Sequence, residues 1–128
     1  MDYVAKEELR LEAYRRLAAV TTATEVDDIR TEWEDRYGPL PAPAESLLQV
    51  GYLRAECHRL GIRDLQITSS DARIQPIELA VSATIRLRRL SKGAKYKEDL
   101  LQLVVPLPRR QDPSTYLVQF LRDLVPAD

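Results

Sequence analysis

The residues best equipped for chemistry in this 128-residue chain are its one cysteine and its one histidine, which are adjacent at Cys57 and His58. A catalytic thiol needs a base within direct hydrogen-bond reach. Adjacent helical residues point about 100° apart, so Cys57 and His58 would not face each other. Cys57 also continues an apolar stripe from Leu53 to Leu60, which predicts a small buried residue. We therefore expect no nucleophilic site here, no metal site on a histidine without spaced partners, and no internal disulfide.

Phosphate chemistry is not indicated either. The four glycines stand far apart, and no two could form a loop that cradles phosphates: Gly38, Gly51, Gly61 and Gly93. We expect a domain that is not an enzyme, holds no cofactor and takes no small-molecule substrate.

Composition places the chain among folded proteins, with 45% hydrophobic and 30% charged residues. It contains no apolar run of the ~18 residues that a membrane helix needs. Acidic residues at Asp2, Glu7 and Glu8 do not fit a signal peptide. We expect a cytoplasmic protein with no membrane partner.

One acidic group could bind a partner. Glu32 and Asp35 are three residues apart on a predicted helix, which makes them neighbours on its surface, and Arg36 follows. Two adjacent carboxylates can receive an arginine or lysine of another surface. The residues alone describe an ordinary solvated helix face equally well, and by sequence alone that is the simpler interpretation.

A basic group offers the alternative of nucleic-acid contact, since clustered cations bind phosphates and Tyr96 could stack on a base. Its members are Arg86, Arg88, Arg89, Lys92, Lys95 and Lys97. A net charge of −1 speaks against nucleic acid as the partner of the domain alone, because such domains usually show a clear basic excess.

Three helices are predicted for the first half. Apolar residues at helical spacing fill Val4–Val20. A second helix opens with Thr24 as its cap and ends at Gly38-Pro39, with Trp33 and Tyr37 in or near the core. A third starts near Pro43 and ends at Gly61.

The second half is predicted to form a small, mainly antiparallel sheet and a C-terminal helix. Ile62–Ile67 and Ile74–Ala80 look like a hairpin, and Pro76 would place the second strand at an edge or bend it there. Residues 82–90 fit a helix capped by Ser82 or an alternating strand, and we favour the helix. The remaining elements are strands at 95–98 and 100–107 and a helix that Asp112-Pro113 opens and Pro126 ends. The fold class is α+β, in one domain over residues 1–128.

Three segments carry a family resemblance across nearly the whole chain. They are Arg10-Leu11-Glu12-Ala13-Tyr14-Arg15-Arg16-Leu17-Ala18, Glu32-Trp33-Glu34-Asp35-Arg36-Tyr37-Gly38-Pro39-Leu40-Pro41 and Leu60-Gly61-Ile62. The chain resembles the C-terminal domain of bacterial transcription-repair coupling factors. The most specific part is the motif within the second segment in which Glu32 is followed by Asp35-Arg36-Tyr37-Gly38 and then by Pro41.

The resemblance implies one terminal domain of a longer DNA translocase, with the motor elsewhere in the polypeptide. It implies a regulatory, autoinhibitory role, in which the domain docks on the UvrA-binding module of the same polypeptide and masks it. It also places Glu32, Asp35 and Arg36 on the docking face.

Overall fold

The first half of the chain folds into three helices, α1 (Glu7–Ala18), α2 (Ala23–Tyr37) and α3 (Ala42–Leu60). The computed structural model describes residues 7–127, with side chains from Leu11 onward. The predicted helix start at Val4 lies outside these residues. Trp33 is buried, as predicted, but Tyr37 is 39% exposed, so its expected core position is wrong.

The ends of α2 and α3 follow from their capping chemistry. Thr22, and not the predicted Thr24, caps α2, because its hydroxyl accepts from the Glu25 backbone while Glu25 reaches back to the amide of Thr22. Gly38 ends α2 at φ +86°, and Gly61 ends α3 in the left-handed region at φ +74°. Pro43 lies in the first turn of α3, as expected.

The second half contains the four strands and two further helices. A single antiparallel sheet has the strand order β1-β2-β4-β3. Its elements in chain order are β1 (Asp64–Ile67), β2 (Asp71–Gln75), α4 (Val81–Leu90), β3 (Lys95–Lys97), the short 3-10 helix η1 (Glu98–Leu100), β4 (Gln102–Pro106) and α5 (Pro113–Leu124). The α+β class, the three N-terminal helices and the C-terminal helix are therefore confirmed.

The second strand differs from the prediction. It runs over Asp71–Gln75 and not Ile74–Ala80, because Pro76 has no N–H to donate and the ladder stops before it. Of the two alternatives expected from Pro76, the edge strand is wrong, since β2 pairs with β1 on one side and with β4 on the other, whereas the chain does bend at Pro76.

The ambiguous segment 82–90 is a helix, as favoured. It begins one residue earlier than predicted, with Ala80 at the cap position and no side-chain cap, so Ser82 does not cap it. Ala83 and Leu87 form its buried side.

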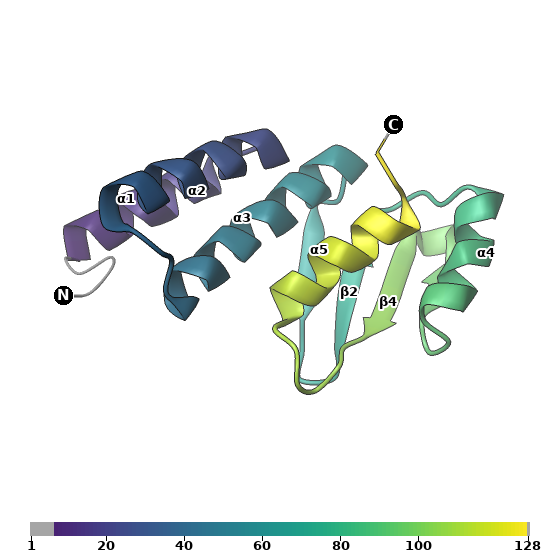
Figure 1. Ribbon diagram of the computed structural model, residues 1–128. Coiled ribbons are helices and arrows are strands. Elements are labelled where there is room, and N and C mark those ends of the chain that lie inside the picture. Colours follow the sequence, from purple (N-terminus) through teal and green to yellow (C-terminus); the bar gives the residue numbers. More distant parts are fainter. Residues whose placement is uncertain (1–6, 128) are drawn as a thin grey trace.

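The two halves are joined through α3. This helix packs against α1, α2 and α5, and α5 lies across one face of the sheet (Figure 1). The covered face carries buried apolar side chains from the two central strands, namely Ala72, Ile74, Leu103 and Val105. Most side chains of the two central strands that point to the other face are polar, and Arg73 is exposed there, whereas Val104 is half-buried.

Candidate functional site

The inner side of α2 fixes the helix to the core. Val26, Ile29 and Trp33 are buried and belong to the hydrophobic cluster that α2 shares with its neighbours. The turn of about 100° per residue then directs Asp28, Thr31 and Asp35 to the opposite side, and all three are exposed. We call these three residues the outer stripe of α2.

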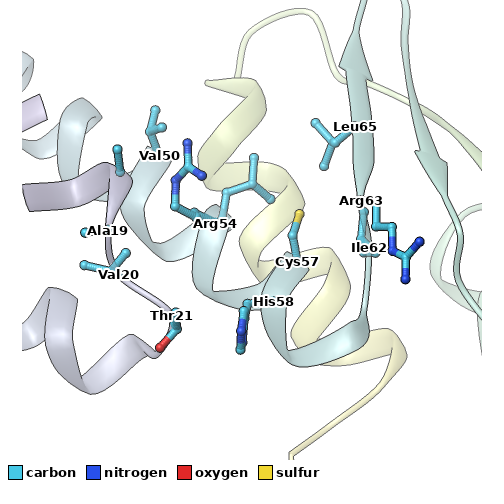
Figure 2. A pocket seen from close by; sticks show the side chains of 12 residues that line it. Ala19, Val20, Thr21, Val50, Arg54, Cys57, His58, Ile62, Arg63 and Leu65 are labelled. Carbon is cyan, nitrogen blue, oxygen red and sulfur yellow. The ribbon is translucent and has the colours of Figure 1, made fainter. Parts of the chain in front are cut away.

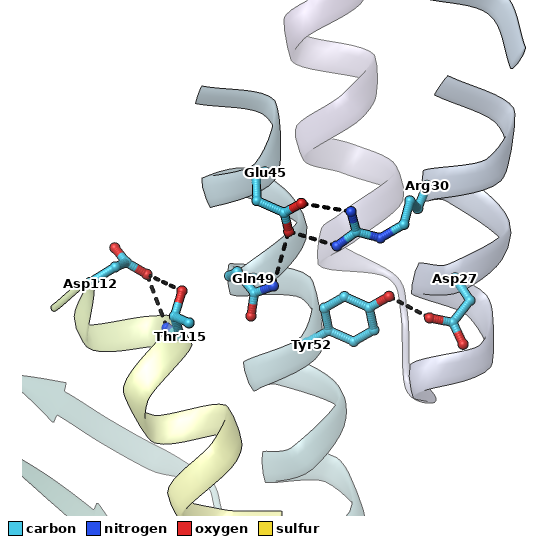
Figure 3. Close-up of polar contacts among 7 residues, drawn as sticks. All are labelled: Asp27, Arg30, Glu45, Gln49, Tyr52, Asp112 and Thr115. Carbon is cyan, nitrogen blue, oxygen red and sulfur yellow. Dashed lines mark hydrogen bonds and ion pairs between the residues drawn. The ribbon is translucent and has the colours of Figure 1, made fainter. Parts of the chain in front are cut away.

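One flank of α2 is tied to α3 by polar contacts (Figure 3). The Arg30 guanidinium donates to both carboxylate oxygens of Glu45 at 2.6 Å, and Gln49 donates to the same carboxylate at 3.0 Å. The Tyr52 hydroxyl donates to Asp27. Arg30 also lies 5.8 Å from the centre of the Tyr52 ring. A bidentate pair of this kind fixes the two helices in register.

These contacts change the ionisation of the groups that make them. The hydrogen bonds from Arg30 lower the pKa of Glu45 to about 2, because they favour the charged carboxylate. Burial raises the pKa of Tyr52, and its bond to Asp27 adds to this. Near neutral pH, Glu45 therefore stays a carboxylate and Tyr52 stays a neutral phenol, and both act as structural contacts.

The other flank of α2 contacts α1. Glu32 lies 2.6 Å from the Arg16 guanidinium and 3.7 Å from that of Arg36, and its side chain is half-buried. Arg36 also lies 5.4 Å from the centre of the Tyr37 ring. Glu32 therefore has two cationic neighbours within the domain.

The predicted trio is thus divided by the structure. Glu32 and Arg36 are brought together, whereas Asp35 lies on the outer stripe and has no ion pair among the residues the structure describes. Asp28, seven residues before Asp35 and so on the same side, is likewise exposed and without an ion pair in the described part of the chain. The acidic group predicted from the sequence did not include Asp28. The spacing of seven residues between Asp28 and Asp35 is the signal by which the sequence could have grouped them.

The basic group is also divided. Arg86 donates at 2.5 Å to the carbonyl of Leu124 at the end of α5. The Tyr96 hydroxyl donates to the carbonyl of Ile77 and accepts from the Leu79 amide, so its ring is anchored within the fold. Arg88 and Arg89 are exposed on α4, and Lys95 and Lys97 are exposed on β3. The segment does not form one surface with a stacking ring.

Cys57 and His58 line a groove beside α3 (Figure 2). Figure 2 shows the Cys57 sulfur and the His58 ring pointing in different directions from α3. Burial raises the pKa of the Cys57 thiol to about 11, which keeps it protonated near neutral pH. Cys57 is half-buried and not fully buried as predicted, and the geometry does not assemble a nucleophile with a base.

Two further searches bear on function. Over residues 7–127, no group of three or more His, Cys, Asp and Glu is placed to hold a metal ion. Within the same range, no helix has both the length and the apolar character to cross a membrane.

Comparison with known proteins gives a consistent picture. Residues 1–91 match the TRCF domain. The chain is 41% identical over 98% of its length to the transcription-repair-coupling factor of Mycobacterium tuberculosis, and 31% identical over 96% to that of Escherichia coli. The matched region is 11% of each of these relatives, so the chain spans about a tenth of their length.

A solved structure shares the fold. It is the crystal structure of the C-terminal domain of a transcription-repair coupling factor, with a TM-score of 0.74 over 96% of this chain and 83% of that one. At 16% sequence identity, this likeness speaks for the architecture alone.

Proposed function

Because the chain belongs to the transcription-repair coupling factor family, we propose that it is a regulatory domain without catalysis of its own, which docks on the UvrA-binding module of the same polypeptide. Docking would mask that module and so hold the factor in an autoinhibited state. In this proposal α2 supplies the docking face, through Asp35 and Glu32, with Arg36 beside them.

The observation that carries the proposal is the chemistry of the outer stripe of α2. Asp28 and Asp35 are exposed carboxylates without an ion pair among residues 11–127. The inner side of the same helix is buried, and the flank that faces α3 is held by Arg30 and Tyr52. A helix that is already folded and presents exposed carboxylates suits a basic surface, because little conformational freedom is lost on docking.

The contact between Glu32 and Arg16 reduces the contribution to docking that we expect from Glu32. A partner arginine that approaches Glu32 must share it with Arg16, which already lies at 2.6 Å. Asp35 has no such competitor among the described residues. We therefore expect Asp35 to contribute more to docking than Glu32.

The small free energy of each of these ion pairs suits an intramolecular docking contact that must be reversible. An exposed ion pair contributes about 0.2–1 kcal/mol, so two or three of them bind only weakly between separate molecules. Two modules in one polypeptide meet at an effective concentration of ~mM, which makes weak contacts sufficient. Screening by salt should also weaken them.

The proposal is tested by titration calorimetry of this chain into a separately produced UvrA-binding module of the same coupling factor. We expect saturable binding at low salt, weakened about tenfold by Asp35→Ala with Asp28→Ala, as two lost ion pairs imply. Glu78→Ala is the matched control, because Glu78 is an exposed carboxylate outside α2 that has no ion pair in the described part of the chain. An equal loss with the control, or no effect of the double variant, contradicts docking through α2.

The nucleic-acid alternative has less support. Its cations lie on α4, on β3 and against the end of α5, and Tyr96 is bound to the backbone at Ile77 and Leu79. A salt-sensitive gel shift of a DNA duplex that Arg88→Ala with Arg89→Ala abolishes would favour it over the docking proposal.

A further inference from the structure

The groove beside α3 lies on a different part of the molecule from the outer stripe of α2. It has a volume of about 560 Å³ and is formed where the end of α1 and the connection after it, the middle of α3 and the start of β1 come together (Figure 2).

The floor of the groove is apolar and its mouth is not closed. Val20, Leu53 and Ile62 are buried beneath it, whereas Val50 is 49% exposed and Leu65 is half-buried. Figure 2 shows Leu65 and the Cys57 sulfur directed into the same space between the strand and α3. The groove therefore offers apolar surface that an entering side chain would remove from water.

The charge around the groove has one sign. The two charged residues of its lining, Arg54 and Arg63, are exposed, as is His58, and no carboxylate lines it. None of the three forms an ion pair with any carboxylate in the described part of the chain. A lining whose formal charges are all positive favours an anionic ligand.

The groove also borders a free sheet edge. β1 is the outermost strand of the order β1-β2-β4-β3, so half of its backbone N–H and C=O groups point away from β2. Leu65 on this strand lines the groove, and Ile67 at its end is 42% exposed. An extended peptide can add to such an edge through main-chain hydrogen bonds and place alternate side chains in adjacent pockets.

We propose that this groove binds an extended, acidic peptide segment of a partner protein, which pairs with the free edge of β1, inserts an apolar side chain over Leu53 and Leu65, and places carboxylates at Arg54 and Arg63. The apolar floor distinguishes this ligand from a nucleic acid, whose backbone would leave it empty. The proposal is independent of α2 docking, because the two surfaces share no residue.

The test uses nuclear magnetic resonance of the isotopically labelled chain with an acetylated octapeptide in which leucine alternates with glutamate. We expect saturable chemical-shift changes of the amides of residues 62–67 and of the groove-facing turns of α3. The amides of the outer stripe of α2 should not shift. The same peptide with lysine in place of glutamate should bind at least ~10-fold more weakly, since its charges oppose those of the groove.

Variants of the protein locate the contact. Arg54→Glu with Arg63→Glu should weaken binding of the leucine–glutamate peptide at least ~10-fold. Arg88→Glu with Arg89→Glu, which makes the same change in charge on exposed α4, should leave it unchanged. Thermal unfolding of each variant checks that the fold is retained.

The backbone contribution is tested without changing the protein. Two versions of the peptide are compared, one N-methylated at the leucines and one at the glutamates. The version that is methylated at the amides that pair with β1 should lose binding, and the other version should retain it. Equal binding of both methylated peptides would overturn strand pairing. No saturable shift at ~1 mM peptide, or shifts that the lysine peptide reproduces, would overturn the proposed ligand. Shifts that grow with protein concentration in the absence of peptide would make a second copy of the chain the occupant, and would also overturn it.

Discussion

The two polar sides of α2 carry similar residues and have different roles. On the flank that faces α3, Asp27 and Arg30 are bound to Tyr52 and Glu45. On the outer stripe, Asp28 and Asp35 have no ion pair within the described residues. The residue type is the same, and only the neighbouring helix decides whether a carboxylate holds the fold together or remains available to a partner.

Glu32 stands between these two cases. It is half-buried against α1, where Arg16 holds it, and the proposed function would also have it take part in docking. Four measurements test whether the sides of α2 differ in this way.

The largest effect is expected at the buried side. Trp33→Ala removes a large side chain that is only 5% exposed and should lower the free energy of unfolding by about 3–5 kcal/mol, because a cavity remains in the core. Urea denaturation followed by circular dichroism measures this. A loss below ~1 kcal/mol would show that α2 is not held by its inner side.

The second prediction concerns the flank that faces α3 and the pH dependence of stability. Because the pKa of Glu45 is lowered from 4.5 to about 2, its contribution is fully present above pH 4.5 and is lost as the pH falls toward 2. Glu45→Gln should lower stability by about 0.2–1 kcal/mol near neutral pH and flatten the decline over this acid range. Thermal unfolding at a series of pH values checks both, and an unchanged acid slope in the variant would contradict the assignment.

An effect on stability of the same order as that of Glu45→Gln is expected at Glu32. Glu32→Ala breaks the contact with Arg16 and should reduce stability by about 0.2–1 kcal/mol. Arg16→Ala should cost a similar amount, and the double variant should cost no more than either alone. Strict additivity in this cycle would show that the ion pair contributes nothing in solution.

The smallest effect on stability is expected at the outer stripe. Asp35→Ala should change the free energy of unfolding by less than ~0.5 kcal/mol, because the side chain is exposed and has no ion pair in the described part of the chain. In the docking titration it should weaken binding more than Glu32→Ala does. The reverse order would show that Glu32 exchanges Arg16 for the partner without cost.

Several elements of the fold could be predicted from local chemistry. Gly38-Pro39 and Gly61 end their helices where the sequence places the ends, and Asp112 caps α5 through the Thr115 amide. The errors occur where several local patterns compete. Thr22 and Thr24 can both cap a helix, and the capping box with Glu25 selects Thr22. The apolar run from Ile74 onward resembles a strand, but Ile77 instead donates its amide to Leu101 and lies outside the ladder.

Local sequence patterns located the helices and several of their ends, such as Gly38 and Gly61, because capping, helix period and the absent N–H of proline act over a few residues. The sequence also indicated the family through its most specific segment, Glu32–Pro41. The packing of distant segments was needed to show that Arg16 binds Glu32 and not Asp35, that β2 is an inner strand, and that Arg54 of α3 and Arg63, just before β1, line one groove. These features depend on which distant segments pack together, and no local spacing encodes that.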